Sequence, residues 1–95
     1  MPSDVTGVYA VVRGMVQGVG FRYWVQREAR MAGLGGWVRN REDGSVECRL
    51  LGPRAAVEAV LERLGKGPAG SDVSAVEVEW GPPDDLGGPD FEILL

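Results

Sequence analysis

Residues 14–22 read Gly-Met-Val-Gln-Gly-Val-Gly-Phe-Arg and decide the fold, because they connect a strand-like run to a helix-like run. Residues 5–13 alternate as a β-strand does, and since both faces are mostly apolar we expect this strand in the middle of a sheet. Residues 21–32 carry apolar side chains at helical spacing and predict a helix. Those side chains are Phe21, Trp24, Val25, Ala29 and Ala32. Gly33 suits the left-handed residue just past a helix end.

The next part of the chain predicts a hairpin and a second helix. Residues 37–41 and 45–51 are strand-like, and Glu-Asp-Gly at 42–44 is turn-forming sequence between them. Residues 53–64 begin with a proline, which a helix tolerates in its first turn. The helix has an apolar stripe of Val57, Val60, Leu61 and Leu64. A hairpin followed by an amphipathic helix is therefore expected here.

The C-terminal part predicts two more strands. Residues 73–80 alternate, which places Val76, Val78 and Trp80 on the inward face. Residues 81–90 are rich in proline and glycine and predict an irregular connection, and residues 91–95 predict a short terminal strand.

The predicted element order is β-α-β-β-α-β with a short C-terminal strand. Two helices must then cover one face of a largely antiparallel sheet, which is the α+β, ferredoxin-like split βαβ sandwich. With 95 residues, we expect residues 1–95 to form one domain. This architecture hosts enzymes, metabolite sensors and RNA-binding modules, so the fold alone does not decide the function.

Composition narrows the chemistry. The chain has no histidine, so its chemistry must proceed without a histidine base, nucleophile or metal ligand. The single cysteine, Cys48, cannot form an internal disulfide, and no run resembles a secretory signal or a membrane span. We therefore expect a reduced, cytoplasmic setting and no membrane partner.

Charge is unevenly distributed along the chain. Residues 5–41 contain six arginines and one acid, whereas the rest of the chain carries nine more acids than bases, which together give the net charge of −4. A segment kept nearly free of carboxylates can serve to bind an anion, although arginines also fall on solvated faces by chance.

The glycines of residues 14–22 have a specific physical capability. A Gly-x-Gly turn can align successive backbone N–H groups into a concave nest, and the helix behind it adds the positive end of its dipole. Arg22 lies in the first turn of that helix, where its guanidinium can bind a phosphate through two hydrogen bonds. The sequence favours a phosphate cradle over a plain glycine-rich turn. It is neither a Walker-type loop nor a dinucleotide fingerprint, because the required residues are absent.

Other polar and aromatic candidates are less specific. Asn40 ends the strand that enters the hairpin, where its amide could orient a water or simply satisfy nearby backbone. Cys48 lies on an apolar strand face with no base available, so we expect it in the core. We also expect Trp24, Trp37 and Trp80 in the core rather than exposed to bind a base.

At these residues the sequence resembles the acylphosphatase family. Residues 14–22 match its first signature, Gly-x-Val-Gln-Gly-Val-x-Phe-Arg. Gly-Trp-Val-Arg-Asn at 36–40, followed by Asp-Gly-Ser-Val-Glu at 43–47, matches its second. The glycine–proline pairs at 52–53 and 67–68 and the Phe-Glu-Ile at 91–93 also fit, so the resemblance covers nearly the whole chain.

The resemblance implies a monomeric, metal-independent hydrolase without a cofactor. Its substrate is a small-molecule acyl phosphate, which it cleaves to a carboxylate and inorganic phosphate. Arg22 and Asn40 are the implied catalytic residues, with Arg22 binding phosphate and Asn40 positioning the attacking water. The implied phosphate-binding loop, which uses its backbone amides, comprises Gln17, Gly18, Val19, Gly20, Phe21 and Arg22.

This chemistry is compatible with a chain that lacks histidine. The leaving carboxylate has a pKa near ~4 and departs without being protonated, so no general acid is required. The phosphoryl transition state mainly needs positioning and charge stabilisation. In the family, the substrate's own phosphate oxygen is expected to accept the proton of the water.

Three other functions are less well supported. A non-catalytic regulatory module of the same topology could use the cradle to bind an anion or metabolite without turnover. RNA recognition fits poorly, because the chain is acidic and residues 45–51 lack base-stacking aromatics, so no nucleic-acid partner is expected. Action on carbamoyl phosphate occurs in a related domain of hydrogenase-maturation proteins, which is part of a much longer chain.

Overall fold

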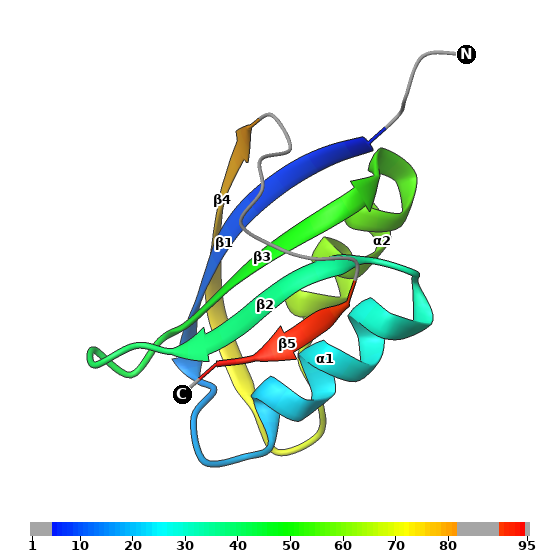
Figure 1. Cartoon of the computed structure of the whole chain (residues 1–95). Coiled ribbons are helices and arrows are strands. Elements are labelled where there is room, and N and C mark those ends of the chain that lie inside the picture. The colour runs from blue at the N-terminus through cyan, green and yellow to red at the C-terminus, as the bar shows by residue number, and fades with distance from the viewer. Residues whose placement is uncertain (1–4, 82–89, 95) are drawn as a thin grey trace.

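The computed structural model describes residues 5–81 and 90–94. These described residues form five strands in one sheet and two helices (Figure 1). The elements in chain order are β1 (Val5–Met15), α1 (Phe21–Met31), β2 (Gly35–Asn40), β3 (Val46–Pro53), α2 (Arg54–Leu64), β4 (Asp72–Gly81) and β5 (Phe91–Ile93). The order across the sheet is β4-β1-β3-β2-β5. Only the β2–β5 pair is parallel, and both helices cover the same face (Figure 1), so the ferredoxin-like prediction is confirmed.

The core lies between this sheet and the two helices. On β1 the alternate residues Val8, Ala10 and Val12 are completely buried, as expected for a central strand. The two helices meet the sheet through the stripes predicted from their spacing. The buried residues of these stripes are Phe21, Val25 and Ala29 on α1 and Val57, Val60 and Leu64 on α2. Burial of these apolar stripes is the main source of helix stability, because isolated helices of 11 residues are marginal in water.

The first strand runs two residues further than its sequence pattern predicted. A β-bulge between Arg13 and Gly14 lets β1 continue to Met15 while it stays paired with β4. Gly14 has a φ of +127°, and a Cβ there would lie 2.1 Å from the carbonyl oxygen of Asp72. The first glycine of the signature is therefore required by the close approach of two backbones.

Other boundaries differ by only a few residues. The second helix begins at Arg54, with Pro53 as the residue that precedes it, and the last strand ends at Ile93. Gly33 has the expected positive φ, +75°, at the end of α1. The predicted irregular connection at 81–90 falls mostly on residues 82–89, which lie outside the described residues.

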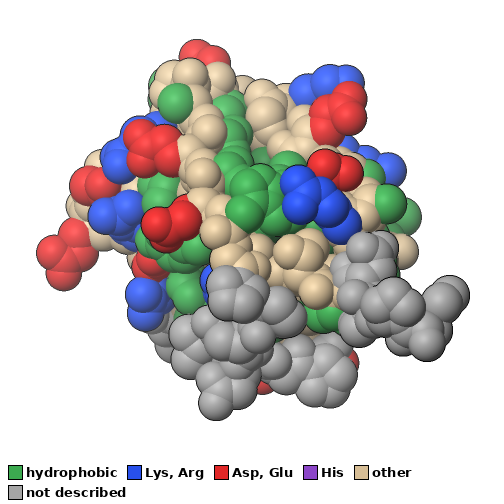
Figure 2. All heavy atoms as spheres, turned by 90° about the horizontal axis from the view of Figure 1, so that it is seen from above, with side chains coloured by type: hydrophobic (Ala, Val, Ile, Leu, Met, Phe, Trp, Pro, Cys, Tyr) green, Lys and Arg blue, Asp and Glu red, His purple; other side chains and the backbone are tan. Residues whose placement is uncertain are grey.

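Two of the three tryptophans are not in the core, so that prediction was wrong. Trp24 is half-buried and packs against the core, but Trp37 lies on the sheet face without helices, near the ring of Tyr9 at 6.5 Å between centroids. Trp80 and Val78 are on the helix-facing side of β4 yet are 38% and 40% exposed. β4 is an edge strand, and α2 covers the Trp80 ring only with the guanidinium of Arg54, 4.2 Å from the ring centroid. Figure 2 views the molecule from the end where β1 begins and β4 ends, and it shows exposed hydrophobic side chains at that end.

No helix in the described part of the chain is long and apolar enough to cross a membrane.

Candidate active site

The turn between β1 and α1 holds two glycines in the left-handed conformation. Gly18 has a φ of +78°, and Gly20, which precedes the first residue of α1, has a φ of +77° and a ψ of 21°. A Cβ at either position would meet nothing within 4 Å. These two glycines are therefore required by backbone conformation and not by lack of space.

The amino terminus of α1 is open to an anion. The first helical hydrogen bond runs from the N–H of Trp24 to the carbonyl oxygen of Gly20, at 3.0 Å. The N–H groups of residues 21–23 have no acceptor among the described residues, and no side chain caps the helix. The first turn also contains no acidic residue. Free donors and the positive end of the helix dipole thus point out of the same turn.

A small cavity of about 110 Å³ brings this turn together with the two candidate side chains. Its lining consists of Val16, Gly18, Gly20, Phe21, Arg22, Tyr23 and Asn40. Asn40 enters it from the end of β2, 18 residues beyond Arg22 in the chain. The two residues that sequence analysis selected are therefore neighbours across one cavity.

The side chain of Arg22 is half-buried and makes a single hydrogen bond to the described residues. Its Nη1 donates to the carbonyl oxygen of Leu94, at 3.3 Å, and no carboxylate among the described residues pairs with it. The guanidinium therefore keeps donors and its full charge for another acceptor.

The side-chain amide oxygen of Asn40 is free to accept a hydrogen bond. Its Oδ1 is buried and has no hydrogen-bond partner among the described residues. A buried acceptor without a partner costs free energy, and such groups in native proteins are usually completed by a water or a ligand. A water bound between this oxygen and the cavity would satisfy it.

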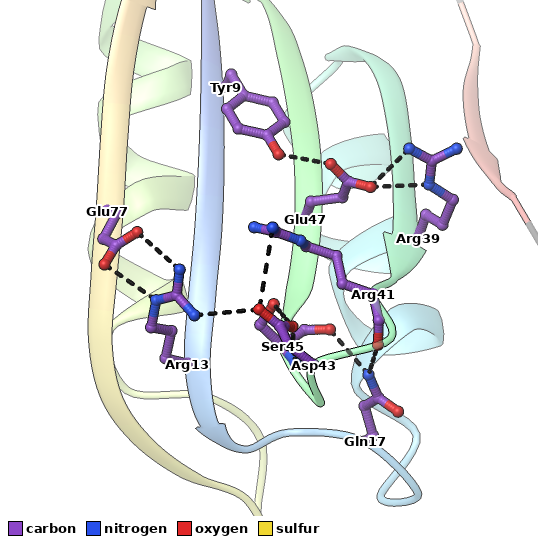
Figure 3. Close-up of polar contacts among 9 residues, drawn as sticks. All are labelled: Tyr9, Arg13, Gln17, Arg39, Arg41, Asp43, Ser45, Glu47 and Glu77. Carbon is purple, nitrogen blue, oxygen red and sulfur yellow. Dashed lines mark hydrogen bonds and ion pairs between the residues drawn. The ribbon is translucent and has the colours of Figure 1, made fainter.

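The side chains of the loop divide between the core and the hairpin. Phe21 has a buried side chain and lines the cavity, whereas Val19 packs against the core and is not among the lining residues. Gln17 points instead to the β2–β3 connection, where its Nε2 donates to the carbonyl oxygens of Arg41 at 2.8 Å and Ser45 at 2.9 Å (Figure 3). The loop thus offers the cavity N–H groups and the guanidinium of Arg22.

Comparison with known proteins identifies the family of this chain. The acylphosphatase family model matches residues 8–93. The chain belongs to the acylphosphatase family. It is 56% identical to an acylphosphatase of Mesorhizobium japonicum over 83 residues, which is 83% of this chain and 88% of that protein. It is 48% identical to an acylphosphatase of a Synechococcus species, over 96% of this chain and 95% of that one.

Solved structures give the same result. The crystal structure of acylphosphatase from Bacillus subtilis superposes with a TM-score of 0.90 at 38% identity, covering 95% of this chain and 99% of that chain. As an acylphosphatase, the protein is a hydrolase of acyl phosphates, which decides against a purely regulatory module.

The hairpin of this acylphosphatase carries an ion-pair cluster that sequence analysis missed. Asp43 accepts hydrogen bonds from the hydroxyl and backbone N–H of Ser45, and it pairs with Arg13 at 3.3 Å and Arg41 at 3.9 Å (Figure 3). The hydrogen bonds from Ser45 and the nearby guanidinium groups lower the pKa of Asp43 to about 2. The turn sequence predicted the hairpin, but nothing in it indicated that Arg13, 30 residues earlier, reaches the turn.

A larger cavity of about 560 Å³ lies beside the hairpin but does not fit the reaction. Its lining consists of Arg39, Asn40, Arg41, Glu42, Asp43 and Glu47. The arginines here already have carboxylate partners, since Arg39 pairs with Glu47 at 2.6 Å and Arg41 lies 3.9 Å from Asp43. Burial opposes ionisation of Glu47, but its hydrogen bonds with Tyr9 and Arg39 outweigh this and lower its pKa. The smaller cavity remains the candidate active site.

The thiol of Cys48 is not accessible in the folded protein. Cys48 is buried on β3, and burial raises the pKa of its thiol to about 12, so the core prediction is confirmed. Among residues 5–81 and 90–94, no group of three or more His, Cys, Asp or Glu side chains could hold a metal ion.

Proposed function

We propose that the phosphoryl group of an acyl phosphate binds in the cavity between the β1–α1 turn and Asn40. The observation that carries this proposal is the convergence of the first turn of α1, Arg22 and Asn40 on one cavity. Among the described residues, the N–H groups of residues 21–23 have no acceptor, Arg22 pairs with no carboxylate, and the buried Oδ1 of Asn40 has no hydrogen-bond partner. The first two suit phosphate oxygens, and the third suits a water hydrogen.

Arg22 and the turn act as the phosphate holder. Charge builds on the equatorial oxygens of phosphorus in the transition state, and fixed donors aimed at these oxygens stabilise it without reorganising. The turn formed by Gly18 and Gly20 supplies the donors from the backbone, and Arg22 supplies a full positive charge.

Asn40 orients the attacking water. Its Oδ1 accepts one hydrogen of the water, which aims a lone pair of the water oxygen at phosphorus. The new phosphorus–oxygen bond forms as the bond to the acyl oxygen breaks, and the carboxylate leaves with the bonding electron pair. The second proton of the water passes to a phosphate oxygen, so the products are a carboxylate and inorganic phosphate. Because the carboxylate is a weak base with a pKa near ~4, no acid has to protonate it.

The test is hydrolysis of benzoyl phosphate in the presence of a chelator. We expect the unmodified protein to turn over, and Arg22→Ala and Asn40→Ala each to lose on the order of 10²-fold or more in kcat/KM. Arg30→Ala is the matched control, because Arg30 is exposed in the last turn of α1, at the other end of the helix. Full turnover by folded Arg22→Ala refutes the mechanism, and loss of activity on chelation refutes metal independence.

We further propose that the enzyme is a single-domain cytoplasmic monomer that needs no cofactor and interacts only with its acyl phosphate substrate and phosphate product. The single, buried cysteine supports a reduced compartment, and the acidic composition argues against a nucleic-acid partner. Light scattering after size-exclusion chromatography tests the monomer directly. Rates compared across acetyl, carbamoyl and benzoyl phosphates test which acyl groups are accepted.

A further inference from the structure

Gln17 connects the two halves of the proposed site through its side chain. It lies in the phosphate-holding loop, one residue before Gly18, whereas both of its acceptors belong to the connection that follows Asn40 (Figure 3). Both hydrogens of its Nε2 are used, one for the carbonyl oxygen of Arg41 and one for that of Ser45. Arg41 directly follows Asn40, so Gln17 fixes the chain one residue from the proposed water-positioning group.

The hairpin does not need Gln17 in order to close. The carbonyl oxygen of Ser45 already accepts from the N–H of Arg41 at 2.8 Å, and the carbonyl oxygen of Arg41 accepts from the N–H of Gly44 at 3.2 Å. Removing the Gln17 amide therefore leaves neither carbonyl without a partner. The Gln17 amide instead holds the β1–α1 turn at a fixed distance from the β2–β3 hairpin.

A second contact ties the beginning of the loop to the same hairpin. Arg13, just before Gly14, pairs with Asp43 at the hairpin turn, but the two side chains are 41% and 43% exposed. Exposed ion pairs are weak and yield to salt. The hydrogen bond from Gln17 to Ser45 is partly buried and forms closer to Asn40, so it controls the geometry more directly.

We propose that Gln17 is a positioning residue that sets the distance between the phosphate holder and Asn40, and that its side chain does not bind phosphate. This inference rests on the proposed function. It predicts that loss of the Gln17 amide slows turnover while phosphate still binds, because the N–H groups and Arg22 stay in place and only the aim of the water changes.

The experiment compares Gln17→Ala, Asn40→Ala and the double variant for kcat on benzoyl phosphate and for inhibition by inorganic phosphate. We expect Gln17→Ala to lower kcat on the order of 10- to 100-fold, as a misplacement near 1 Å does. The phosphate inhibition constant should change by less than about threefold. In the Asn40→Ala background, Gln17→Ala should lower kcat by less than about twofold further, because coupled residues are non-additive. Gln17→Glu, which cannot donate when ionised, should match Gln17→Ala.

Gln26→Ala serves as the matched control. Gln26 also donates its Nε2 to a backbone carbonyl, that of Phe91 at 3.1 Å, but it does not line the proposed site. If Gln26→Ala lowers kcat as much as Gln17→Ala, the effect is structural and the inference is wrong. It is equally wrong if the Gln17 and Asn40 effects add, or if phosphate inhibition weakens in step with kcat.

The outcomes also separate this inference from the proposed function. Normal turnover by Gln17→Ala beside loss of turnover by Asn40→Ala refutes the positioning role alone. Full turnover by Asn40→Ala refutes the proposed role of Asn40 and, with it, positioning through Asn40.

Discussion

Replacing Gly20 by alanine tests whether the turn between β1 and α1, which we propose binds the phosphate, needs glycine for its conformation or also for activity. Gly20 has a φ of +77°, and an added Cβ would meet nothing within 4 Å. The cost is therefore one of backbone conformation, about 1–2 kcal/mol for an L-residue in the left-handed region. Part of it, about 0.4–1 kcal/mol, is offset because alanine restricts the unfolded chain. We expect a net loss of about 1 kcal/mol, which lowers Tm by about 4–8 °C in a domain of this size.

The same helix offers a matched control at its other end. Gly33 has a φ of +75°, and a Cβ there would also meet nothing within 4 Å. Gly33→Ala should therefore lower Tm as much as Gly20→Ala. Any backbone shift at Gly20 that relieves the strain turns N–H donors away from the cavity, whereas a shift at Gly33 leaves them in place. Displacing a fixed donor costs on the order of 10²-fold in kcat.

The assay is benzoyl phosphate hydrolysis together with thermal unfolding of both variants. We expect similar losses of Tm, with kcat reduced only in Gly20→Ala. If both variants keep the kcat of the unmodified protein, or if both lose it equally, the turn is not the phosphate holder and the reasoning is refuted.

Three further predictions follow from burial, charge and close approach. Because the folded-state pKa of Asp43 is lowered from 3.8 to about 2, its stabilising contribution is complete above pH 3.8 and is lost as pH falls toward 2. Acid unfolding of Asp43→Asn, followed by circular dichroism, should thus show less loss of stability over that range, and an unchanged profile contradicts this. The thiol of Cys48 should react with a chromogenic disulfide at pH 8 only after unfolding, so rapid labelling of the native protein contradicts its burial. Gly36→Ala should cost more than about 3 kcal/mol in denaturant unfolding, because its Cβ would lie 1.8 Å from the carbonyl oxygen of Arg49, and a near-neutral result contradicts the strand spacing.

Local patterns predicted the elements well where periodicity and burial agree. The alternation around Val8 and the helical spacing around Val25 both predict a core position, and both side chains are completely buried. Trp37 and Trp80 were misplaced because a strand's alternation assigns a residue to a face but does not say whether helices cover that face. Trp37 lies on the face without helices, and on the edge strand β4 only the guanidinium of Arg54 from α2 covers the ring of Trp80.

The candidate site was predictable in its residues but not in its connections. Gly20 and Arg22 could be predicted from the sequence, because a positive-φ turn and the start of a helix both have local sequence signals. The bonds of Gln17 and Arg13 to the hairpin join segments 24 to 30 residues apart, and no local pattern encodes such contacts. Whether the Oδ1 of Asn40 finds a partner likewise depends on the packing of the whole site, and among the described residues it has none.

Phosphate binding by Arg22→Ala and Asn40→Ala, measured by calorimetry and set beside their kcat, tests the division of roles most directly. We predict that Asn40→Ala binds inorganic phosphate as the unmodified protein does, while its kcat falls on the order of 10²-fold. Arg22→Ala should lose both phosphate affinity and turnover. Normal phosphate binding by Arg22→Ala, or loss of phosphate binding by Asn40→Ala in step with its kcat, contradicts the assignment of Arg22 to the phosphate and Asn40 to the water.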